Sequence, residues 1–335
     1  MTLPVYVIPA QSSAPARGIF LNSAAANCSI YESGLMFARA LQGSSEFALD
    51  YMEIARFEHI PPGYDFYLFN YHHVTMRWLD PRRIRELGGR KLGLVWEMLP
   101  DDPLVLYPDV FDAYLVPDPT LECPDERVFA FPRPLELATD LPACEERDVP
   151  VIGSFGFATP GKGFDAVVWA AGHEFERAIV RLNIPTGTHA DEGGRRARAY
   201  ADLCRLIAKR GIELRIEHRY LSKPALVAWC AQNTVNVFLY HRDQPGLSAT
   251  TDQAISSGRP LLVSPCHTFR HIHAYQSPYP ATSIKAAIAS GAAAVSTMQA
   301  DWHPSATRRR FERVLARISS SFRPSRVPER ATSSR

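Results

Sequence analysis

Short apolar runs alternate with helical patterns through the second half of the chain. Five runs have the length and composition of strands: VPVIGSF (149–155), AIVRLNI (178–184), IELRIEH (212–218), VNVFLYH (235–241) and LLVS (261–264). Helical spacing of apolar residues occupies the intervals between them, at 164–172, 192–209, 223–233 and 248–257. Strands that alternate with helices predict a parallel sheet covered by helices on both faces.

The first half repeats this α/β pattern less regularly. Its strand candidates are 5–9, 48–54, 65–71, 91–98, 113–117 and 127–131, and its helix candidates are 31–42 and 81–87. A segment rich in Pro and charge, 132–150, has no clear period and separates the two halves. We therefore expect two parallel-sheet domains, 1–140 and 141–303, followed by a helix at 304–318. The Ser-, Arg- and Pro-rich tail, 319–335, has the composition of a disordered segment.

Composition supports a globular protein of this size. The chain has 335 residues, of which 46% are hydrophobic and 21% charged, enough apolar side chains for two cores. Its formal net charge of +2 gives no general reason to bind nucleic acid. The 6 cysteines are scattered without a CxxC pair, which argues against a zinc site and against a disulfide framework.

The cellular location of the protein is predicted from the targeting and membrane-spanning patterns that its sequence does not contain. The N-terminal MTLPVYVIPA has no basic region before a long apolar core, so a signal peptide is not expected. No run approaches the roughly 18 apolar residues of a membrane span. We expect a cytoplasmic protein, whose basic tail could contact the anionic inner face of a membrane. The sequence does not predict an oligomeric state.

The loop GSFGFATPGKGFD (153–165) is the first candidate for chemistry. It follows a buried strand and precedes a helix, in the place where open parallel sheets bind ligands. Its four glycines would let backbone N–H groups approach an anion, and Lys162 adds a positive charge. It matches neither a P-loop nor GxGxxG. The alternative is a tight strand-to-helix turn with a surface lysine.

A second candidate lies in HRDQPGLSATTDQAISSGRPLLVSP (241–265). Thr250 and Gln253 form a T-x-x-Q capping box, or Ser248 caps directly, and Gly258 fits the end of the helix. The N–H groups of this helix entry could face an anion. Asp252 and Gln253 on the first turn could accept from sugar hydroxyls. Alternatively, the hydroxyls only cap the helix and Asp252 only interacts with its dipole.

Together the two segments resemble the family-four glycosyltransferases. The resemblance rests on the Gly-Lys-Gly loop and on a later segment whose family pattern ends in E-A-x-x-x-G-x-P-V, which reads QAISSGRPL (253–261) here. It covers the second half well and the first half only through strand order and loop positions. It implies the GT-B fold, in which two Rossmann-like domains face each other across a cleft and the last helix crosses back to the first domain.

The resemblance also implies a donor site on the second domain. A nucleotide diphosphate would rest on the Gly/Lys loop and the helix entry, with ribose on the first helical turn and the base near the loop after the third strand. The corresponding residues are Gly153, Gly156, Lys162, Tyr220, Arg242, Gly246, Leu247, Ser248, Thr250, Asp252 and Gln253. Arg242 is a candidate replacement for the family arginine, whose position is taken by Gly156.

Two further differences from the family pattern concern glutamates. Pro245 and Gln253 stand where the family has E-x7-E, so Asp252 is the acid nearest to the ribose position. An amide can partly replace a carboxylate toward a hydroxyl. After the last strand, Arg270 and three histidines of HTFRHIHAY (267–275) either approach the diphosphate or form an ordinary charged surface.

The first domain offers acceptor-side candidates. Glu32, Ser33 and Gly34 lie at its first helix, where an acceptor could come close. An apolar strand leads directly into His72 and His73, and the resemblance gives a histidine of this loop contact with the donor sugar or acceptor. The alternatives are ordinary helix-dipole chemistry for the glutamate and a hinge or capping pair for the histidines.

One carboxylate completes the candidate catalytic set. Glu97 lies near the end of the predicted strand KLGLVWEM (91–98) and is the carboxylate of the first domain best suited to orient an acceptor hydroxyl. We name His73 and Glu97 as the candidate catalytic residues and His72, Glu32, Ser33 and Gly34 as the candidate acceptor contacts. No DxD or histidine spacing suggests a metal.

The implied activity is sugar transfer. A UDP- or GDP-sugar would donate to a hydroxyl of a saccharide or lipid-linked acceptor, without a metal or further cofactor and with retention at the anomeric carbon. A non-catalytic protein of this fold that binds a nucleotide sugar or serves as a scaffold is the first alternative. A sugar-nucleotide epimerase is the second; it needs a pair of acid/base carboxylates, and only Glu97 and Asp252 are offered.

Overall fold

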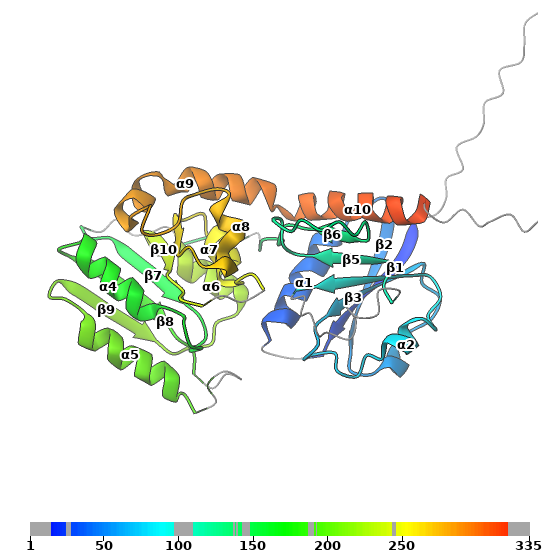
Figure 1. The fold of residues 1–335 in the computed structure, drawn as a ribbon, viewed down its shortest axis with the longest axis horizontal. Helices are drawn as coiled ribbons and strands as arrows, with labels where there is room; N and C mark the ends of the chain where they lie inside the picture. Colours follow the sequence, from blue (N-terminus) through cyan, green and yellow to red (C-terminus); the bar gives the residue numbers. More distant parts are fainter. Residues whose placement is uncertain are drawn as a thin grey trace, which may run out of the picture.

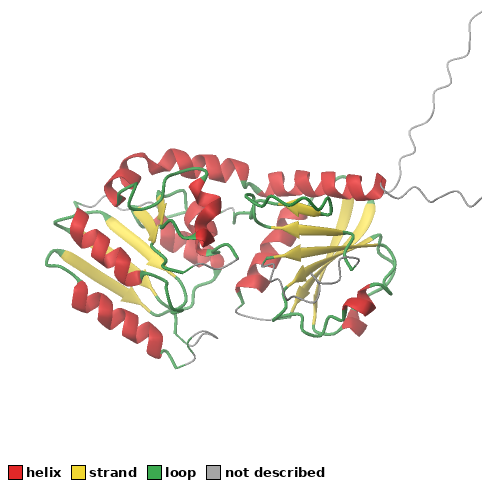
Figure 2. Cartoon of the chain, in the orientation of Figure 1, coloured by secondary structure: helices red, strands yellow, loops and turns green. Residues whose placement is uncertain are grey.

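Two parallel sheets, each with its own helices, make up the protein (Figure 1). The computed structural model describes residues 15–24, 28–96, 110–136, 138, 140–142, 148–186, 191, 193–242 and 246–320. The two α/β units lie side by side, and a pair of consecutive helices spans them along one side (Figures 1 and 2). The predicted fold class, two parallel-sheet domains, is confirmed.

The first domain contains a six-stranded sheet in the order β2-β1-β3-β4-β5-β6, and all of its pairings are parallel. Its strands are β1 (Ala16–Ser23), β2 (Phe47–Ile54), β3 (Phe66–Tyr71), β4 (Arg90–Val95), β5 (Ala113–Val116) and β6 (Val128–Ala130). Its helices are α1 (Ser29–Leu41), the short α2 (Pro81–Ile84) and the 3-10 turn η1 (Phe57–His59). Alternate residues of the strands point to opposite faces, so that Ile19 and Leu21 enter one core and Phe20 the other.

The second domain contains a five-stranded parallel sheet in the order β11-β10-β7-β8-β9. Its strands are β7 (Val151–Phe155), β8 (Ala178–Asn183), β9 (Ile212–Glu217), β10 (Val235–Phe238) and β11 (Leu261–Val263). Its helices and turns are α4 (Phe164–Glu174), α5 (Arg195–Ile207), α6 (Lys223–Ala231), α7 (Thr250–Ser256), η2 (His267–Phe269), α8 (Arg270–His273) and α9 (Ile284–Asp301). Every strand predicted here is present within a few residues of its expected bounds.

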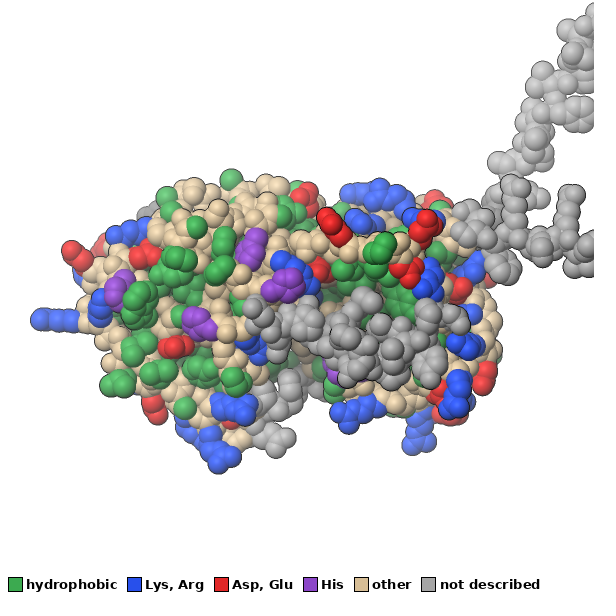
Figure 3. Space-filling view, in the orientation of Figure 1, with side chains coloured by type: hydrophobic (Ala, Val, Ile, Leu, Met, Phe, Trp, Pro, Cys, Tyr) green, Lys and Arg blue, Asp and Glu red, His purple; other side chains and the backbone are tan. Residues whose placement is uncertain are grey.

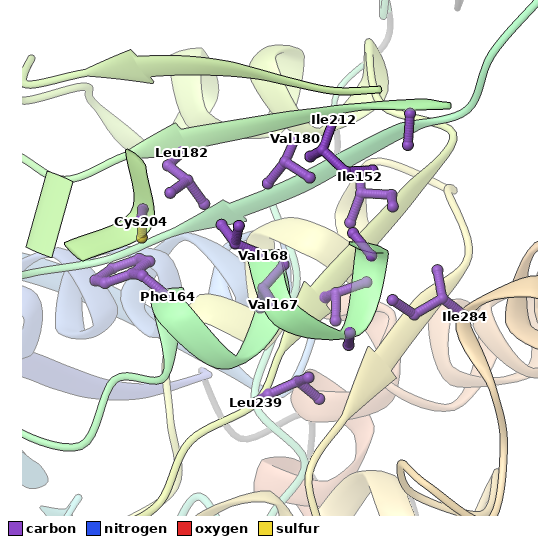
Figure 4. Packing of buried hydrophobic residues seen from close by; sticks show 14 of the residues in the cluster. Ile152, Phe164, Val167, Val168, Val180, Leu182, Cys204, Ile212, Leu239 and Ile284 are labelled. Carbon is purple, nitrogen blue, oxygen red and sulfur yellow. The ribbon is translucent and has the colours of Figure 1, made fainter. Parts of the chain in front are cut away.

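Helices cover both faces of this second sheet. On one face, Phe164, Val167 and Val168 of α4 pack against Ile152 and Leu182 of the strands (Figure 4). On the other face, side chains of α6, α7 and α9 pack against β7 and β10; they include Trp229, Cys230, Ala254, Ile255, Val295 and Met298. This arrangement confirms the parallel sheet with two covered faces that the alternating pattern predicts.

Strand β1 and the long helix α9 were not predicted from the sequence. Strand β1 lies between β2 and β3 in the first sheet, yet its apolar run is short, because Arg17 lies near its start and the buried Asn22 and Ser23 form its end. The strand predicted at 5–9 lies outside the described residues. Helix α9 buries only the narrow stripe Ile284, Ala287, Gly291, Val295 and Met298, and its many alanines give a weak amphipathic signal.

The chain ends its described part on the first domain. Helix α10 (Pro304–Ser320) follows α9 directly and packs on α1. Its Phe311, Val314 and Ile318 belong to the same core as Phe47 and Phe66. Its arginines lie on other sides of the helix, and Figure 3 shows Lys and Arg side chains gathered over it. We propose the domain bounds 1–140 and 141–303 with 304–318 as the crossing helix; the packing of α10 supports them.

The attachment of α10 can be tested by removing its largest buried side chain. Phe311 is 0% exposed, and its ring lies 5.2 Å from that of Phe47 and 5.8 Å from that of Phe66. Phe311→Ala should lower the free energy of unfolding by about 3–5 kcal/mol, measured by urea denaturation. Leu206→Ala, at a side chain that is 82% exposed, is the control and should change little. Equal effects of the two substitutions would contradict the packing of α10.

Candidate functional site

Glycines shape the loop that follows β7. Gly156, Gly161 and Gly163 have φ values of 148°, 78° and 63°, which side chains rarely adopt. A Cβ atom on Gly163 would lie 1.7 Å from the carbonyl oxygen of Leu239. The loop therefore passes directly over the end of β10, where only glycine fits.

Gly153 has a different role. It lies inside β7, and a Cβ atom there would be 1.9 Å from Nδ2 of Asn233 at the end of α6. Its missing side chain accommodates this packing, and Gly153 is not part of the loop that carries Lys162. Of Gly153 and Gly156, the two glycines of 153–165 proposed for the donor site, only Gly156 lies next to the lysine.

Lys162 lies in a cluster of hydroxyl groups between the two predicted segments. Its Nζ donates to the phenol oxygen of Tyr240 at 2.9 Å and lies 4.2 Å from the centre of that ring. The phenol oxygen is 3.1 Å from Oγ1 of Thr250 and 3.4 Å from Oγ of Ser248, and these two hydroxyl oxygens are 2.9 Å apart. The Gly/Lys loop and the entry of α7 therefore meet at one point.

The charge of Lys162 is not balanced by an acid within the described part of the chain. Lys162 is only 9% exposed, and no described carboxylate lies within 4.0 Å of its ammonium group. A buried cation with only neutral partners is costly. The cluster is thus suited to an anion, and its hydroxyls can donate to the same anion.

The entry of α7 is held by η2. The Gly246 carbonyl accepts from Oγ1 of Thr268 at 2.8 Å, and the Ser248 N–H donates to the Thr268 carbonyl at 3.2 Å. The backbone N–H of Ser248 thus has a partner within the protein. Leu247, between these residues, is half-buried.

The predicted helix cap is wrong. The N-cap residue of α7 is Ala249, which has no side-chain cap. The hydroxyls of Ser248 and Thr250 bind each other and Tyr240, and so are not available to cap the helix. The prediction assumed that hydroxyls at a helix start accept from backbone N–H groups, whereas here they form hydrogen bonds within the cluster around Tyr240.

Asp252 is part of an ion pair that joins the two domains. Nε of Arg133, which follows β6, lies 2.9 Å from both carboxylate oxygens of Asp252. Both side chains are buried, 5% and 1% exposed. Burial raises the pKa of Asp252, while the charges of Arg133 and Lys223 act against this increase. The carboxylate proposed to bind ribose is therefore engaged by a protein cation in this conformation.

Gln253 points a free donor into the interior. The residue is 3% exposed, and its Nε2 has no hydrogen-bond partner among the described residues. Buried amide groups usually have partners. Gln253 therefore remains a candidate to donate to a ligand hydroxyl, at the position where the sequence expected an acceptor.

A second cation joins the domains at α1. Nζ of Lys223, on the first turn of α6, lies 3.1 Å from Oγ of Ser33 and 3.1 Å from Sδ of Met36. Burial lowers the pKa of Lys223 to about 8, and the charge of Asp252 partly offsets the decrease. Ser33 thus has a partner in the second domain. Gly34 lies against β3, where a Cβ atom would be 2.1 Å from Nδ2 of Asn70.

The histidine pair follows β3 as predicted from the sequence. The rings of His72 and His73 stack with centres 4.4 Å apart, and Nδ1 of His72 accepts from the N–H of Val74. Nδ1 of His73 is buried and has no described partner. Ser23, at the end of β1, donates to the Thr75 carbonyl at 3.0 Å, so the ends of both strands meet here. Glu97 lies outside the described residues.

Tyr220 lies at the outer edge of the site. It is 43% exposed, and its ring stacks on Phe157 of the Gly/Lys loop with centres 6.4 Å apart. Burial, followed by the charges of Glu32 and Cys28, raises the pKa of Tyr220. Glu32, which is half-buried on α1, is therefore near this loop of the second domain.

Two arginines have contacts within the protein. Nη1 of Arg242 donates to Oγ1 of Thr159 at 2.9 Å, within the Gly/Lys loop. Arg270 reaches the first domain, where its Nε and Nη2 lie 2.9 and 2.5 Å from Oδ2 of Asp118. Arg270 therefore makes a third contact between the domains. The sequence had suggested either a diphosphate contact or an ordinary charged surface for Arg270, and neither alternative includes this ion pair.

Two general properties of the described residues bear on the site. They include no group of three or more His, Cys, Asp and Glu side chains that could hold a metal ion. Of the helices in the described ranges, none is both long enough and apolar enough to cross a membrane.

Solved structures with a similar fold are glycosyltransferases. A glycosyltransferase from Rickettsia africae ESF-5 has a TM-score of 0.64 and 9% identity, covering 92% of this chain and 100% of the other. HepE from Anabaena in complex with UDP-glucose has a TM-score of 0.61 and 10% identity, covering 91% and 100%. The lipopolysaccharide outer core galactosyltransferase WaaB has a TM-score of 0.58 and 10% identity, covering 90% and 99%. The chain has the GT-B fold.

The sequence comparisons give no relative. No protein-family model matches the chain, and neither does any curated protein. At these low identities the likeness establishes the GT-B fold alone, and the expectation of that fold is confirmed.

Three residues of the site were missed in the sequence. Tyr240 is the next-to-last residue of the run VNVFLYH (235–241) and looks like an ordinary strand residue, and Arg133 lies in the segment interpreted as a linker. Lys223 looks like an ordinary lysine before a proline on a first helical turn. A polar side chain at the carboxyl end of a parallel strand could have indicated Tyr240. The other two had no such signal.

The cation at α1 leads to a test by pH. Because burial lowers the pKa of Lys223 from 10.5 to about 8, its charge costs roughly 3 kcal/mol in the folded state. This cost is complete below pH 8 and vanishes above about pH 10.5, where the unfolded chain also loses the proton. Lys223→Met should therefore be about 2 kcal/mol more stable than wild type at pH 7, after loss of its hydrogen bond to Ser33.

The advantage of Lys223→Met should decrease steadily between pH 8 and 10, as measured by urea denaturation. Lys209→Met, at an exposed lysine of the same domain, is the control and should show no such trend. A stability difference that is constant from pH 7 to 10 would contradict the buried state of Lys223.

Proposed function

We propose that the protein is a nucleotide-sugar-dependent glycosyltransferase. The single observation that carries the proposal is the buried Lys162 ammonium, which has no described acidic partner and lies among hydroxyls at the carboxyl edge of the second sheet. In a GT-B fold this edge is a place for an anionic ligand. The diphosphate of a UDP- or GDP-sugar carries the negative charge that would balance the Lys162 ammonium.

The cluster also suits the chemistry of transfer. When the bond between the sugar and the diphosphate breaks, negative charge grows on the outer phosphate. Lys162 and the hydroxyls of Ser248 and Thr250 can stabilise that charge because they are fixed before the reaction begins. HepE, a structural neighbour, was solved with UDP-glucose, which supports a UDP-sugar as the first donor to test.

The remaining donor contacts would involve the ribose, the base and the loop around the diphosphate. Gln253 would donate its unpartnered amide N–H to a ribose hydroxyl, and Tyr220 would border the base. Asp252 would reach the ribose only if Arg133 released it. Arg242 and the backbone of Gly246 and Leu247 would support the loop around the diphosphate; Gly153 would act only through packing.

We infer that the acceptor binds on the first domain. His73 would contact the acceptor or donor sugar through its ring, with His72 beside it. Ser33, Glu32 and Gly34 lie at the α1 end that meets the second domain, and Glu97 would orient the acceptor hydroxyl. The resemblance of the motifs adds four further features to the proposal. The acceptor would be a saccharide or a lipid-linked molecule, and the sugar transferred would be a hexose. The reaction would retain the anomeric configuration and would need no metal.

A non-catalytic nucleotide-sugar-binding protein is the second candidate. The observation that favours it is the ion pair between Arg133 and Asp252, which engages the acid on α7, in a chain that has Pro245 and Gln253 at the two glutamate positions. The same pair argues against an epimerase. Incubation with nucleotide sugars, followed by mass spectrometry for hydrolysis or transfer, separates an enzyme from a binder.

Removal of the Lys162 charge tests the donor site directly. Lys162→Ala should weaken binding of UDP or GDP about 10- to 100-fold, because charged hydrogen bonds to phosphate are lost. Isothermal titration calorimetry measures the change. Lys209→Ala removes an exposed lysine of the same domain and should bind as wild type does. Unchanged affinity in Lys162→Ala would show that the diphosphate does not bind there.

Substitution of His73 tests the acceptor side. His73→Ala should keep nucleotide affinity and slow sugar transfer at least about 100-fold, as expected for a group that contacts the reacting sugars. Transfer is measured by release of UDP or GDP with a saccharide acceptor. His59→Ala, at an exposed histidine of the same domain, is the control. Turnover equal to wild type in His73→Ala would remove His73 from the site.

A further inference from the structure

The ring of Tyr240 is fixed in the second domain. Tyr240 follows β10, is 3% exposed, and packs with its ring centre 4.7 Å from that of Phe269 in η2 and 6.3 Å from that of Phe238. The phenol oxygen therefore has one defined position. It lies where the Gly/Lys loop and the entry of α7 approach each other.

The phenol oxygen joins the polar groups of both segments. The oxygen accepts a hydrogen bond from Nζ of Lys162 and is also hydrogen-bonded to the hydroxyls of Thr250 and Ser248. A lysine side chain has four rotatable bonds, so its ammonium needs such a fixed acceptor to keep one position. Without the phenol, no described side chain would hold the ammonium by a hydrogen bond.

Gly156 leaves space beside this cluster. A Cβ atom on Gly156 would lie 3.6 Å from Nζ of Lys162, 3.7 Å from Cγ2 of Thr250 and 3.7 Å from the phenol oxygen of Tyr240. The bare backbone at this position faces all three groups. A ligand that approached Gly156 would thus meet the ammonium and the hydroxyls together.

We propose that Tyr240 is a positioning residue, whose phenol holds the Lys162 ammonium beside Gly156 in readiness for the outer phosphate of a nucleoside diphosphate. The inference rests on the proposed function and extends it to a residue that no family motif marks. When the diphosphate binds, Lys162 donates to phosphate oxygens while the phenol stays bonded to Thr250 and keeps the lysine from turning away. No covalent step is involved.

The phenol must be neutral for this role. Burial raises the pKa of Tyr240, but the Lys162 charge and the hydrogen bonds from Lys162, Ser248 and Thr250 outweigh it, and the pKa lies below its ordinary value of 10.0. The other groups that face the phenol, on α7 and η2, are hydroxyls and the Phe269 ring. Deprotonation would pair a phenolate with Lys162 and repel the diphosphate. Affinity should therefore fall as the pH rises through this lowered pKa.

Calorimetry with UDP and GDP at pH 7.5 and 9.5 tests the proposal. Tyr240→Phe keeps the packed ring, and at pH 7.5 it should bind about tenfold more weakly than wild type. Wild type should lose affinity toward pH 9.5, whereas Tyr240→Phe should lose much less. Tyr275→Phe removes a phenol that donates to Asp301 at 2.9 Å elsewhere in the domain; this control should follow wild type at both pH values.

A second measurement needs no nucleotide. The ultraviolet absorbance of phenolate, taken as the difference between wild type and Tyr240→Phe over pH 8 to 12, isolates the titration of Tyr240. In a Lys162→Met background the same difference should move to higher pH, because burial then acts without the nearby cation. An unmoved titration would show that the two groups are not coupled and would overturn the proposal.

The outcomes separate this proposal from the proposed function. If wild type binds neither UDP nor GDP, the proposed function fails and the role of Tyr240 fails with it. If wild type binds and Tyr240→Phe matches its affinity and pH dependence, only the role of Tyr240 is overturned. If Tyr240→Phe bound tenfold more weakly than wild type by the same factor at pH 7.5 and at pH 9.5, the substitution would have damaged the site in general. That result would also count against positioning.

Discussion

A buried cation needs a partner, and this requirement organises the parts of the two domains that face each other. Arg133 has a carboxylate partner in Asp252, Lys223 has the neutral Ser33 and Met36, and Lys162 has the phenol of Tyr240. Burying a cation costs less free energy when its partner is a carboxylate than when its partners are neutral groups. Arg133 is thus a structural cation, Lys223 is held at the contact between the domains, and Lys162 is the one that lies beside the open backbone of Gly156, where an anion could reach it.

The crossing of the chain makes these contacts possible. Helix α9 completes the core of the second domain through Val295 and Met298, and α10 completes the core of the first through Phe311 and Val314. The two domains are thus held together by a continuous pair of helices. Side chains with charge can then meet between them: Arg133 with Asp252 and Arg270 with Asp118. A flexible linker alone could not keep such buried pairs aligned.

The sequence predicted what local patterns determine. Alternation of strands and helices predicted both sheets, and the glycines around Lys162 predicted a tight loop after β7, because period and backbone freedom are properties of short segments. The partners of charged groups could not be predicted in this way. Arg133 and Asp252 are 119 residues apart and Lys162 and Tyr240 are 78 apart, so their pairing depends on the assembled fold. Strand β1 was missed because it carries polar residues at its ends; the side chains of Arg17 and Asn22 find their partners, Asp50 and Asn70, only in the assembled fold.

Pro245 and Gln253, at the two positions where the motif has glutamates, fit this charge balance. A carboxylate close to Lys162 would form an ion pair with it and would compete with a diphosphate for the same ammonium. Asp252 avoids this competition because Arg133 binds it on the side of α7 that faces the first domain. Among the described residues, the polar side chains around Lys162 are the neutral Ser248, Thr250 and Tyr240, which carry no negative charge to repel a phosphate. A site that lacks the family's acids can therefore remain a good receptor for an anion.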